Sequence, residues 1–370
     1  MADQPAEASG SALPPTRSPL KLSTAILEAQ KLAWAPVAFA VTKAMRDLGV
    51  LSAIRKGGRT GRSVAEIVEE TGLTEHAVKL MTEASISFGL VEQRARGYSI
   101  TKVGYFILRD PMTRANMDFV SDVCFAGFQH FEESAVTGKP AGLRAFGDFL
   151  SKFETIYDGL SQLPPDVLKS WLTFDHFYSD AAFPLILPIL FRSKPARLLD
   201  VGGNTGKFAL CCMRHDADVQ ITIADHPGQL ALAKQNAAEA GFGDRLSGHP
   251  IDALDPPQQL PRGHDIIWMS QFLVCFSEPE IVSILERARA AMGETTQLWI
   301  LETFWDKQEN EVATYCLHGM SPYFTCMANG NSRVYSDPDF LACIERAGLK
   351  VVERHDGIGH GHTMLRCERA

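Results

Sequence analysis

Hydrophobic and polar positions in the first hundred residues follow the spacing of amphipathic helices and then of a short hairpin. Apolar residues recur at helical intervals from residue 21 to about residue 57, and two shorter segments begin at the potential cap residues Ser63 and Thr74. The predicted elements are helices over residues 36–58, 63–73 and 74–90 and a hairpin over residues 91–104 with Gly97 at its turn. Helices followed by a hairpin in this order predict a winged helix-turn-helix domain.

After residue 110 the pattern of hydrophobic and polar positions changes. Residues 111–195 are mostly helical in pattern and rich in aromatic residues, and from about residue 196 strands and helices alternate. The predicted strands cover residues 196–202, 219–225, 264–270, 296–303, 349–357 and 362–368, with a further strand before Asp252, and helices are expected over residues 227–241 and 278–293. This alternation predicts an α/β fold with a doubly wound, Rossmann-like sheet. The last two strands have no room for a helix between them, so they should pair antiparallel.

These patterns divide the chain into four segments. We expect a disordered tail over residues 1–20, the winged-helix domain over 21–110, a helical linker over 111–195 and a ligand-binding α/β domain over 196–370. The N-terminal segment lacks the basic start and apolar stretch of a secretory signal.

Composition narrows the partners and the location. The formal net charge of −8 at pH 7 repels phosphate backbones, so nucleic acid is not expected as a partner. The helix over residues 74–90, which would read DNA in a winged helix, offers only His76 and Lys79, so an oligomerisation role is favoured. The sequence contains no run of 18 apolar residues, so no membrane span is predicted. The eight cysteines include no CxxC pair, which favours a reduced, cytoplasmic setting.

A glycine-rich turn, "LLDVGGNTG" at residues 198–206, directly follows an apolar strand that ends in an acid. A phosphate-binding P-loop is excluded, because Lys207 is followed by Phe208 instead of Ser or Thr. The dinucleotide pattern G-x-G-x-x-G also fails, whether it is started at Gly202 or at Gly203. The turn therefore lacks the usual cradle for a phosphate or a pyrophosphate.

The pattern D-x-G-x-(G/N)-x-G does fit, with Asp200, Gly202, Asn204 and Gly206, and Gly203 lies inside it. It resembles the first motif of the class I S-adenosylmethionine-dependent methyltransferases. That ligand has a zwitterionic amino-acid tail, a sulfonium and a ribose, so it needs close approach of bare backbone. Asn204 is among the non-glycine residues best able to adopt the positive φ that such a turn requires.

Further polar residues at strand ends support a cofactor site. Asp225 ends the second strand, where an acid can accept both ribose hydroxyls. Asp252 follows the third strand, where the resemblance implies contact with the adenine amino group, and Ser270 ends the fourth strand. A helix cap or a turn explains each acid alone equally well.

The order of domains narrows the resemblance. A winged helix, a helical linker and a methyltransferase fold are together similar to the plant-type small-molecule O-methyltransferases and to their bacterial C- and O-methyltransferase relatives. The segments "SQFLVCFSEPE" (270–280) and "YFTCMANGNS" (323–332) carry this resemblance. It implies a homodimer formed through the winged-helix domain, a linker that contributes to the acceptor pocket, and a small aromatic acceptor.

One position departs from that family. The O-methyltransferases place a general-base histidine where this chain has Val274, which cannot accept a proton. The neighbouring Cys275 is a poor substitute and is more simply explained as a packed thiol. We therefore look for the base elsewhere: His176 in the linker is the first candidate and His130 is the second, and Glu302 at the end of the fifth strand is a further catalytic candidate.

Aromatic and polar side chains of the linker and of the strand ends could line the acceptor pocket. Those predicted are His130, Phe131, Tyr178, Phe272, Trp305, Tyr323 and Asn329. His130 is also an alternative base, and Asn329 could equally stabilise a turn around Gly330. His360 and His362 share a strand face, but no clear partner completes a metal site with them, so no metal is predicted.

The sequence thus predicts methyl transfer from S-adenosylmethionine to a small, phenolic acceptor in secondary metabolism. Ring carbon is slightly favoured over oxygen, because the histidine of the O-methyltransferases is missing. One alternative is an aromatic O-methyltransferase with another base. An alternative of a different class is a non-catalytic regulator that binds S-adenosylmethionine and contacts DNA, which would need a basic stripe on the helix over residues 74–90.

Overall fold

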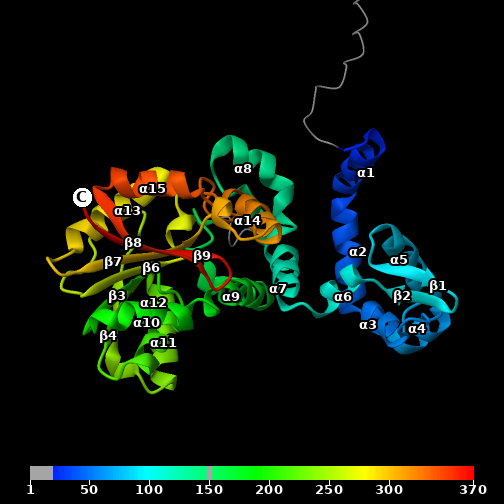
Figure 1. Ribbon diagram of the computed structural model, residues 1–370, viewed down its shortest axis with the longest axis horizontal. Coiled ribbons are helices and arrows are strands. Elements are labelled where there is room, and N and C mark those ends of the chain that lie inside the picture. Colours follow the sequence, from blue (N-terminus) through cyan, green and yellow to red (C-terminus); the bar gives the residue numbers. More distant parts are fainter. Residues whose placement is uncertain (1–19, 148–151) are drawn as a thin grey trace, which may run out of the picture. The chain divides into compact units, whose positions relative to one another are not determined.

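The computed structural model describes residues 20–147 and 152–370, which fall into two compact units that part between Arg114 and Ala115 (Figure 1). The predicted tail lies outside the described residues, apart from Leu20. Among the described helices, none combines the length and the apolar character that crossing a lipid bilayer requires.

The N-terminal unit consists of helices followed by a two-stranded hairpin, in the predicted order. Its elements are α1 (Leu22–Ala33), α2 (Ala35–Asp47), α3 (Val50–Lys56), α4 (Val64–Thr71), α5 (Glu75–Ser87), β1 (Val91–Arg94), β2 (Gly97–Ile100) and α6 (Lys102–Arg109). Ser63 and Thr74 cap α4 and α5 by accepting hydrogen bonds from backbone N–H groups, which confirms both predicted helix starts. Gly97 follows the hairpin turn, and a Cβ there would lie 2.0 Å from the carbonyl oxygen of Arg62.

The prediction of one helix over residues 36–58 is wrong. Helices α2 and α3 are separate, because Gly49 has a φ of 80° in the left-handed region and ends the first helical run. The hydrophobic spacing continues across the break, since Met45 before it and Leu51 and Ile54 after it all enter the same core. Periodicity alone therefore could not reveal the break.

Helices precede the sheet in the C-terminal unit. These are α7 (Pro111–Phe119, which crosses the division between the units), α8 (Phe131–Thr137), α9 (Pro165–Asp180) and α10 (Phe183–Leu190), with shorter helical turns η1 (Val120–Cys124), η2 (Gly127–His130), η3 (Ala141–Phe146), η5 (Leu160–Gln162) and η6 (Phe191–Ser193). The later helices are α11 (Lys207–His215), α12 (Pro227–Glu239), α13 (Glu278–Ala291), α14 (Glu311–Tyr323) and α15 (Asp337–Arg346), with the turns η7 (Gly243–Arg245), η8 (Leu273–Cys275), η9 (Trp305–Lys307) and η10 (Phe324–Ala328).

A seven-stranded sheet has the strand order β5-β4-β3-β6-β7-β9-β8. The strands are β3 (Arg197–Val201), β4 (Gln220–Asp225), β5 (Leu246–Pro250), β6 (Ile266–Ser270), β7 (Gln297–Thr303), β8 (Leu349–Ile358) and β9 (His362–Arg369). Strands β3 to β7 run parallel, and β9 pairs antiparallel with both β7 and β8, as predicted for the last two strands. The α/β prediction is confirmed. The edge strand β5, "LSGHP", lacks an alternating pattern and was expected only from its place before Asp252.

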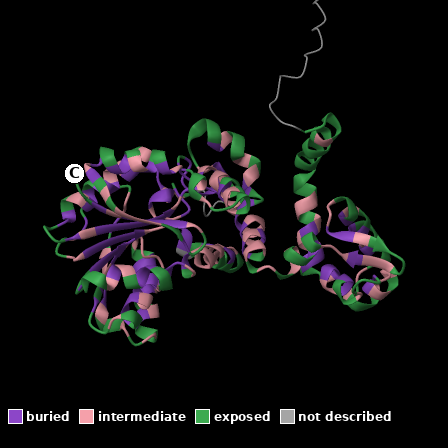
Figure 2. Ribbon diagram, viewed as in Figure 1, coloured by how far each residue is buried: buried purple, intermediate pink, exposed green. Residues whose placement is uncertain are grey.

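Helices cover both faces of this sheet (Figure 1). On one face, α13 and α15 pack apolar side chains such as Ile284 and Phe340 against the strands. On the other face, α10, α11 and α12 contribute Ile186, Phe208 and Leu230 to a second core. The central strands are buried along most of their length (Figure 2), as continuous apolar runs in a parallel sheet require.

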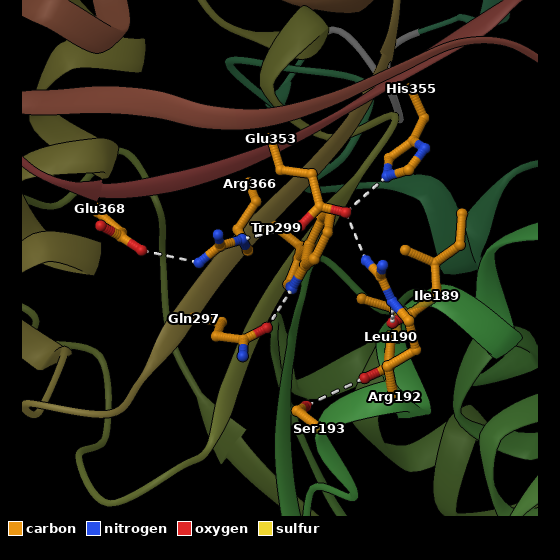
Figure 3. Close-up of polar contacts among 10 residues, drawn as sticks. All are labelled: Ile189, Leu190, Arg192, Ser193, Gln297, Trp299, Glu353, His355, Arg366 and Glu368. Atoms are coloured by element: carbon orange, nitrogen blue, oxygen red, sulfur yellow. Dashed lines mark hydrogen bonds and ion pairs between the residues drawn. The ribbon is translucent and has the colours of Figure 1, made fainter.

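Charged side chains tie the end of the α10–η6 segment to the antiparallel edge of the sheet (Figure 3). Glu353 on β8 accepts hydrogen bonds from Arg192 on η6, from Arg366 on β9 at 3.1 Å and, when the imidazole is protonated on Nε2, from His355 at 2.8 Å. Burial raises the pKa of Glu353, but the hydrogen bonds from Arg192 and His355 outweigh it and hold the pKa at about 2. The carboxylate is therefore ionised over the whole physiological pH range.

Candidate active site

A cavity of about 410 Å³ lies at the carboxyl ends of β3, β4, β6 and β7, within the C-terminal unit. Its roof comes from segments that precede and follow the sheet in sequence, including η1, α9 and α14. Of the predicted site residues, the lining includes His176, Tyr178, Asp200, Gly202, Gly203, Asn204, Asp225, Asp252, Ser270, Phe272, Glu302 and Tyr323. The topology thus brings residues from distant parts of the chain to one cavity.

The glycine turn after β3 is shaped by close contacts. Gly202 has a φ of 72°, and a Cβ there would lie 2.2 Å from the ring of Phe272, so no other residue fits without a shift. Asn204 has a φ of 49°, which confirms the predicted left-handed conformation. Gly206, at a φ of 76°, faces Ala233 of α12 and does not line the cavity. The turn thus presents bare backbone to the space in front of β3.

Hydrogen bonds hold the turn to β4. The N–H of Asn204 donates to Asp225 Oδ2 at 2.8 Å, and Asn204 Oδ1 accepts from Gln229 Nε2 at 2.5 Å. Asp225 Oδ1 accepts the N–H of His226 at 2.7 Å and lines the cavity, but it does not cap α12, which begins after His226 without a side-chain cap. Asp252 Oδ1 similarly accepts the N–H of Leu254 at 2.8 Å. Both acids thus bind backbone of the loop that follows their strand and also line the cavity.

Asp200 is buried, and its Oδ2 atom has no hydrogen-bond partner among the described residues. Burial, and secondarily the negative charge of Asp225, raise the pKa of Asp200 to about 8. A nearby cation would restore the ionised form and remove this cost. The buried Ser270 Oγ also lacks a partner in the described structure. These orphaned atoms and the bare turn fit a cationic, hydroxyl-bearing cofactor such as S-adenosylmethionine.

Glu302 of β7 binds the backbone of the segment that carries Val274. Its Oε1 atom accepts the backbone N–H groups of Leu273 at 2.8 Å and of Val274 at 3.2 Å. The other carboxylate oxygen, Oε2, is buried without a partner in the described part of the chain. Burial raises the pKa of Glu302 to about 8, against the lowering effect of the backbone hydrogen bonds. A carboxyl group able to take up a proton therefore lines the cavity.

Helix α9 presents one face to the cavity. Trp171, Phe174, Asp175 and Tyr178 follow the i, i+3, i+4, i+7 spacing of a single helical face, and all four line the cavity. The ring of Phe174 stacks on Phe119 at 4.1 Å. The indole N–H of Trp171 donates to Tyr323 Oη at 2.8 Å, and Tyr178 Oη donates to Asn116 Oδ1 at 2.8 Å. These contacts build the aromatic part of the cavity, called here the aromatic chamber.

His176 directly follows Asp175 on α9 and also lines the cavity. The helical spacing places its side chain on a different face of the helix from Tyr178. Its Nε2 atom is 4.0 Å from Asp175 Oδ2. Burial and the neighbouring Lys207 lower the pKa of His176, so the imidazole is neutral and able to accept a proton at pH 7. Burial raises the pKa of Asp175 to about 7, despite the opposing effect of Lys207.

Four predicted pocket residues lie outside the lining: His130, Phe131, Trp305 and Asn329. Trp305 packs its ring against His318 at 4.9 Å, and Phe131 is 39% exposed. The side-chain amide of Asn329 donates a hydrogen bond to the backbone carbonyl of Cys275, which is the last residue of η8.

Three residues that line the cavity were not among the predicted site residues: Asn116, Phe119 and Asp175. The helical spacing of residues 171, 174, 175 and 178 is the one signal that could have pointed to Asp175.

The histidines considered for metal have other contacts. His362 is buried on β9, and burial lowers its pKa to about 4, while His360 stacks on Phe177 at 4.9 Å. Within the described residues no group of three or more His, Cys, Asp or Glu side chains could hold a metal ion.

Comparison with known proteins supplies the family. A Dimerisation2-like domain matches residues 27–98, and an O-methyltransferase domain matches residues 191–350. The chain is 22% identical to the L-tyrosine C(3)-methyltransferase of Streptomyces lavendulae, over 87% of each chain. It is 23% identical to the bacteriochlorophyllide d C-20 methyltransferase of Chlorobaculum tepidum, over 76% of this chain and 80% of that protein.

Solved structures have the same fold. The S-adenosylmethionine-dependent methyltransferase SibL matches with a TM-score of 0.67 and 22% identity, over 94% of this chain and 99% of that one. The O-methyltransferase NcsB1, solved with S-adenosylmethionine and 2-hydroxy-5-methyl naphthoic acid, matches with a TM-score of 0.66 and 18% identity, over 90% and 96% of the two chains. The chain therefore belongs to the S-adenosylmethionine-dependent methyltransferases, and S-adenosylmethionine is its cofactor.

Proposed function

We propose that the enzyme methylates a small phenolic acceptor in natural-product synthesis, at a ring carbon in preference to oxygen. The single observation that carries the choice of atom is Val274, which stands where the O-methyltransferases have their histidine base. Glu302 binds the backbone of that segment instead of a histidine side chain. The similarity to an L-tyrosine C(3)-methyltransferase supports carbon, and the aromatic chamber suits a flat ring.

We propose that the strand ends hold the cofactor. Asp225 would accept the ribose hydroxyls, the Gly202–Asn204 turn would lie against the amino-acid tail, and Asp252 would face the adenine. S-adenosylmethionine supplies a methyl group that is already activated as a sulfonium. The residues of the chain then have to align the acceptor carbon with that methyl group and exclude water. Alignment of this kind can lower a barrier by roughly 7–11 kcal/mol.

We assign the proton transfer to Glu302, with His176 as the rival. Methylation at a carbon ortho to a phenol needs the phenolic proton removed while the carbon–methyl bond forms and the sulfur–methyl bond breaks. The ring proton on that carbon then passes to water, and the protonated Glu302 returns its proton to the ring oxygen, which restores the aromatic phenol. Glu302 Oε2 is free of protein partners in the described structure, and it lies at the carboxyl end of β7 beside the cofactor strands.

The position of the new methyl group tests this proposal. We expect 4-ethylphenol incubated with ¹³C-methyl S-adenosylmethionine to give an aryl-methyl carbon resonance, with the label ortho to the hydroxyl. A methoxy resonance instead would show that oxygen is the acceptor and would contradict the assignment to carbon. A reaction without enzyme, and one with S-adenosylhomocysteine added in excess, serve as controls.

We also propose that the enzyme is a homodimer formed through its N-terminal unit. No residue of α1 is buried, and its exposed apolar side chains continue into α2: Leu22, Ile26, Leu27, Leu32, Trp34 and Val37 (Figure 2). An apolar surface of this extent on a Dimerisation2-like domain favours a protein partner. The rival DNA-binding role finds less support, since the exposed side of α5 carries Glu75, paired with Lys79 at 2.6 Å, and the apolar Leu80.

Light scattering tests the dimer. We expect the mass of two chains for the wild-type protein and a shift toward one chain for the double variant Ile26→Glu/Leu27→Glu, because two buried carboxylates oppose association. The variant Glu28→Gln, on the same helix, is the control and should stay dimeric. A monomeric wild-type protein at micromolar concentration would refute the proposal.

A further inference from the structure

Asp175 is a carboxylate in the aromatic chamber whose position is explained neither by a contact within the fold nor by the proposed cofactor site. It lies half-buried on the α9 face that also carries Trp171, Phe174 and Tyr178. No hydrogen bond to its side chain is found among the described residues, and the His176 imidazole, which is neutral at pH 7, lies 4.0 Å from Asp175 Oδ2. A half-buried carboxylate without a partner is costly, so its place in the chamber calls for a ligand group.

The other acids of the cavity are already engaged. Asp158 accepts hydrogen bonds from Thr155 N at 3.0 Å and Thr155 Oγ1 at 2.9 Å. Glu302 is held by backbone N–H groups, and the acids at the ends of β3, β4 and β5 belong to the proposed cofactor site. Asp175 is thus the carboxylate left for the acceptor.

Positive charge in the lining is scarce. Among the described lining residues there is no arginine, and the ammonium of Lys207 is paired with Asp180 at 2.6 Å. A carboxylate on the acceptor would therefore find no bidentate cationic partner there, and it would lie beside the carboxyl group of Asp175, with which it could not share the ionised form at low cost. The chamber disfavours free aromatic acids.

The rings around Asp175 add a second attraction for a cation. Phe174 and Tyr178 lie at 5.1 Å from each other, and Trp171 belongs to the same helical face. Aromatic faces attract ammonium groups through the negative charge of the π-system, and desolvation strengthens this attraction. A carboxylate beside such faces is a suitable site for a protonated amine.

We propose that Asp175 binds a protonated amine carried by the aromatic acceptor, so that the substrates are phenols with a basic side chain. This inference rests on the proposed function and specifies its substrate class. The phenol would occupy the part of the chamber near Glu302, while the side chain of the acceptor would extend along α9 toward Asp175.

A matched set of phenols tests the proposal. Tyramine carries an amine, 4-ethylphenol is its neutral counterpart, and 3-(4-hydroxyphenyl)propionate carries a carboxylate. For the wild-type enzyme we expect kcat/KM to fall in that order, with tyramine preferred over 4-ethylphenol by about 10- to 100-fold, the range of a charge-assisted hydrogen bond. In Asp175→Asn this preference should disappear. Asp166→Asn, an exposed acid in the first turn of the same helix, should keep the wild-type preference.

Binding to the enzyme loaded with S-adenosylhomocysteine gives a second readout. Calorimetry should show the same preference for tyramine in the wild-type enzyme and its loss in Asp175→Asn, provided that the variant still binds S-adenosylhomocysteine. Asp175→Glu keeps the charge and replaces Asp175→Asn if that variant fails to fold; it should retain a preference for tyramine.

Equal treatment of tyramine and 4-ethylphenol by the wild-type enzyme, or a preference for the propionate, would overturn the role of Asp175. Turnover of 4-ethylphenol in that case would leave the proposed function intact. Selective binding of tyramine without methylation of any phenol would instead contradict the proposed function.

Discussion

Replacing Glu302 with glutamine is expected to lower kcat by roughly 10²- to 10⁴-fold, the range in which a general base contributes. Glutamine keeps an oxygen that can accept the N–H groups of Leu273 and Val274, so the local backbone should hold. It removes the oxygen that can take up a proton. Affinity for S-adenosylhomocysteine, measured by calorimetry, should change by no more than a few-fold, because the loss concerns proton transfer.

The pH dependence of kcat/KM separates the two candidate bases. Burial raises the pKa of Glu302 to about 8, and only the ionised carboxylate accepts a proton, so activity should rise with pH and level off above about 8. If His176 were the base, the rise would lie below pH 6.5, because the pKa of that imidazole is lowered. The neutral acceptor 4-ethylphenol is the substrate for this measurement, since it makes no ion pair with Asp175.

His176→Ala is the matched control for Glu302→Gln. We expect it to retain the rise in kcat/KM near pH 8 and most of kcat. The assignment to Glu302 is abandoned if Glu302→Gln keeps wild-type turnover, or if His176→Ala abolishes turnover while cofactor binding persists.

Replacing Asp225 with alanine is expected to weaken binding of S-adenosylhomocysteine by at least about 100-fold. Each hydrogen bond from a ribose hydroxyl to a carboxylate contributes about 1.5–3 kcal/mol, and two of them would be lost. The N–H of Asn204 would lose its acceptor at the same time, so the glycine turn would lose an anchor. Calorimetry with the unmethylated cofactor product measures the effect without any acceptor.

Asp218→Ala is the control for charge, because Asp218 is exposed just before the same strand and is not among the residues that line the cavity. This variant should bind S-adenosylhomocysteine like the wild-type enzyme. A change of less than threefold in Asp225→Ala would exclude Asp225 from the ribose site. A lowered melting temperature in Asp225→Ala without ligand would show how far the turn depends on the same carboxylate.

The features that sequence could predict are those set by local chemistry. Six of the strands of the large sheet are recognisable as apolar runs or alternating segments, and the conformation of Asn204 follows from the spacing of glycines around it. Strand β5 gives no such signal, because Gly248 and Pro250 interrupt it and neighbouring β4 supplies its hydrogen bonds. Gly49 ends a helix whose apolar spacing continues beyond it, so only the three-dimensional structure reveals the break.

In the candidate site, too, the residues that follow directly from local sequence could be predicted, and those that depend on the packing of distant segments could not. The cofactor end is made of residues that follow strands directly, and their places could be inferred from the strand order. The acceptor end depends on how α9, η1 and α14 pack over the sheet. Trp305 and Asn329 lie near strand ends or loops in sequence and yet do not line the cavity. Trp305 packs on His318, and Asn329 binds the backbone of η8.

Helix α1 has twelve residues, none of them buried. A peptide of that length is only marginally helical by itself in water, so its order must come from whatever covers its apolar side. If that cover is a second copy of the chain, dilution should unwind this segment before the rest of the protein loosens. Enzyme concentration would then act on the secondary structure of the N-terminus itself.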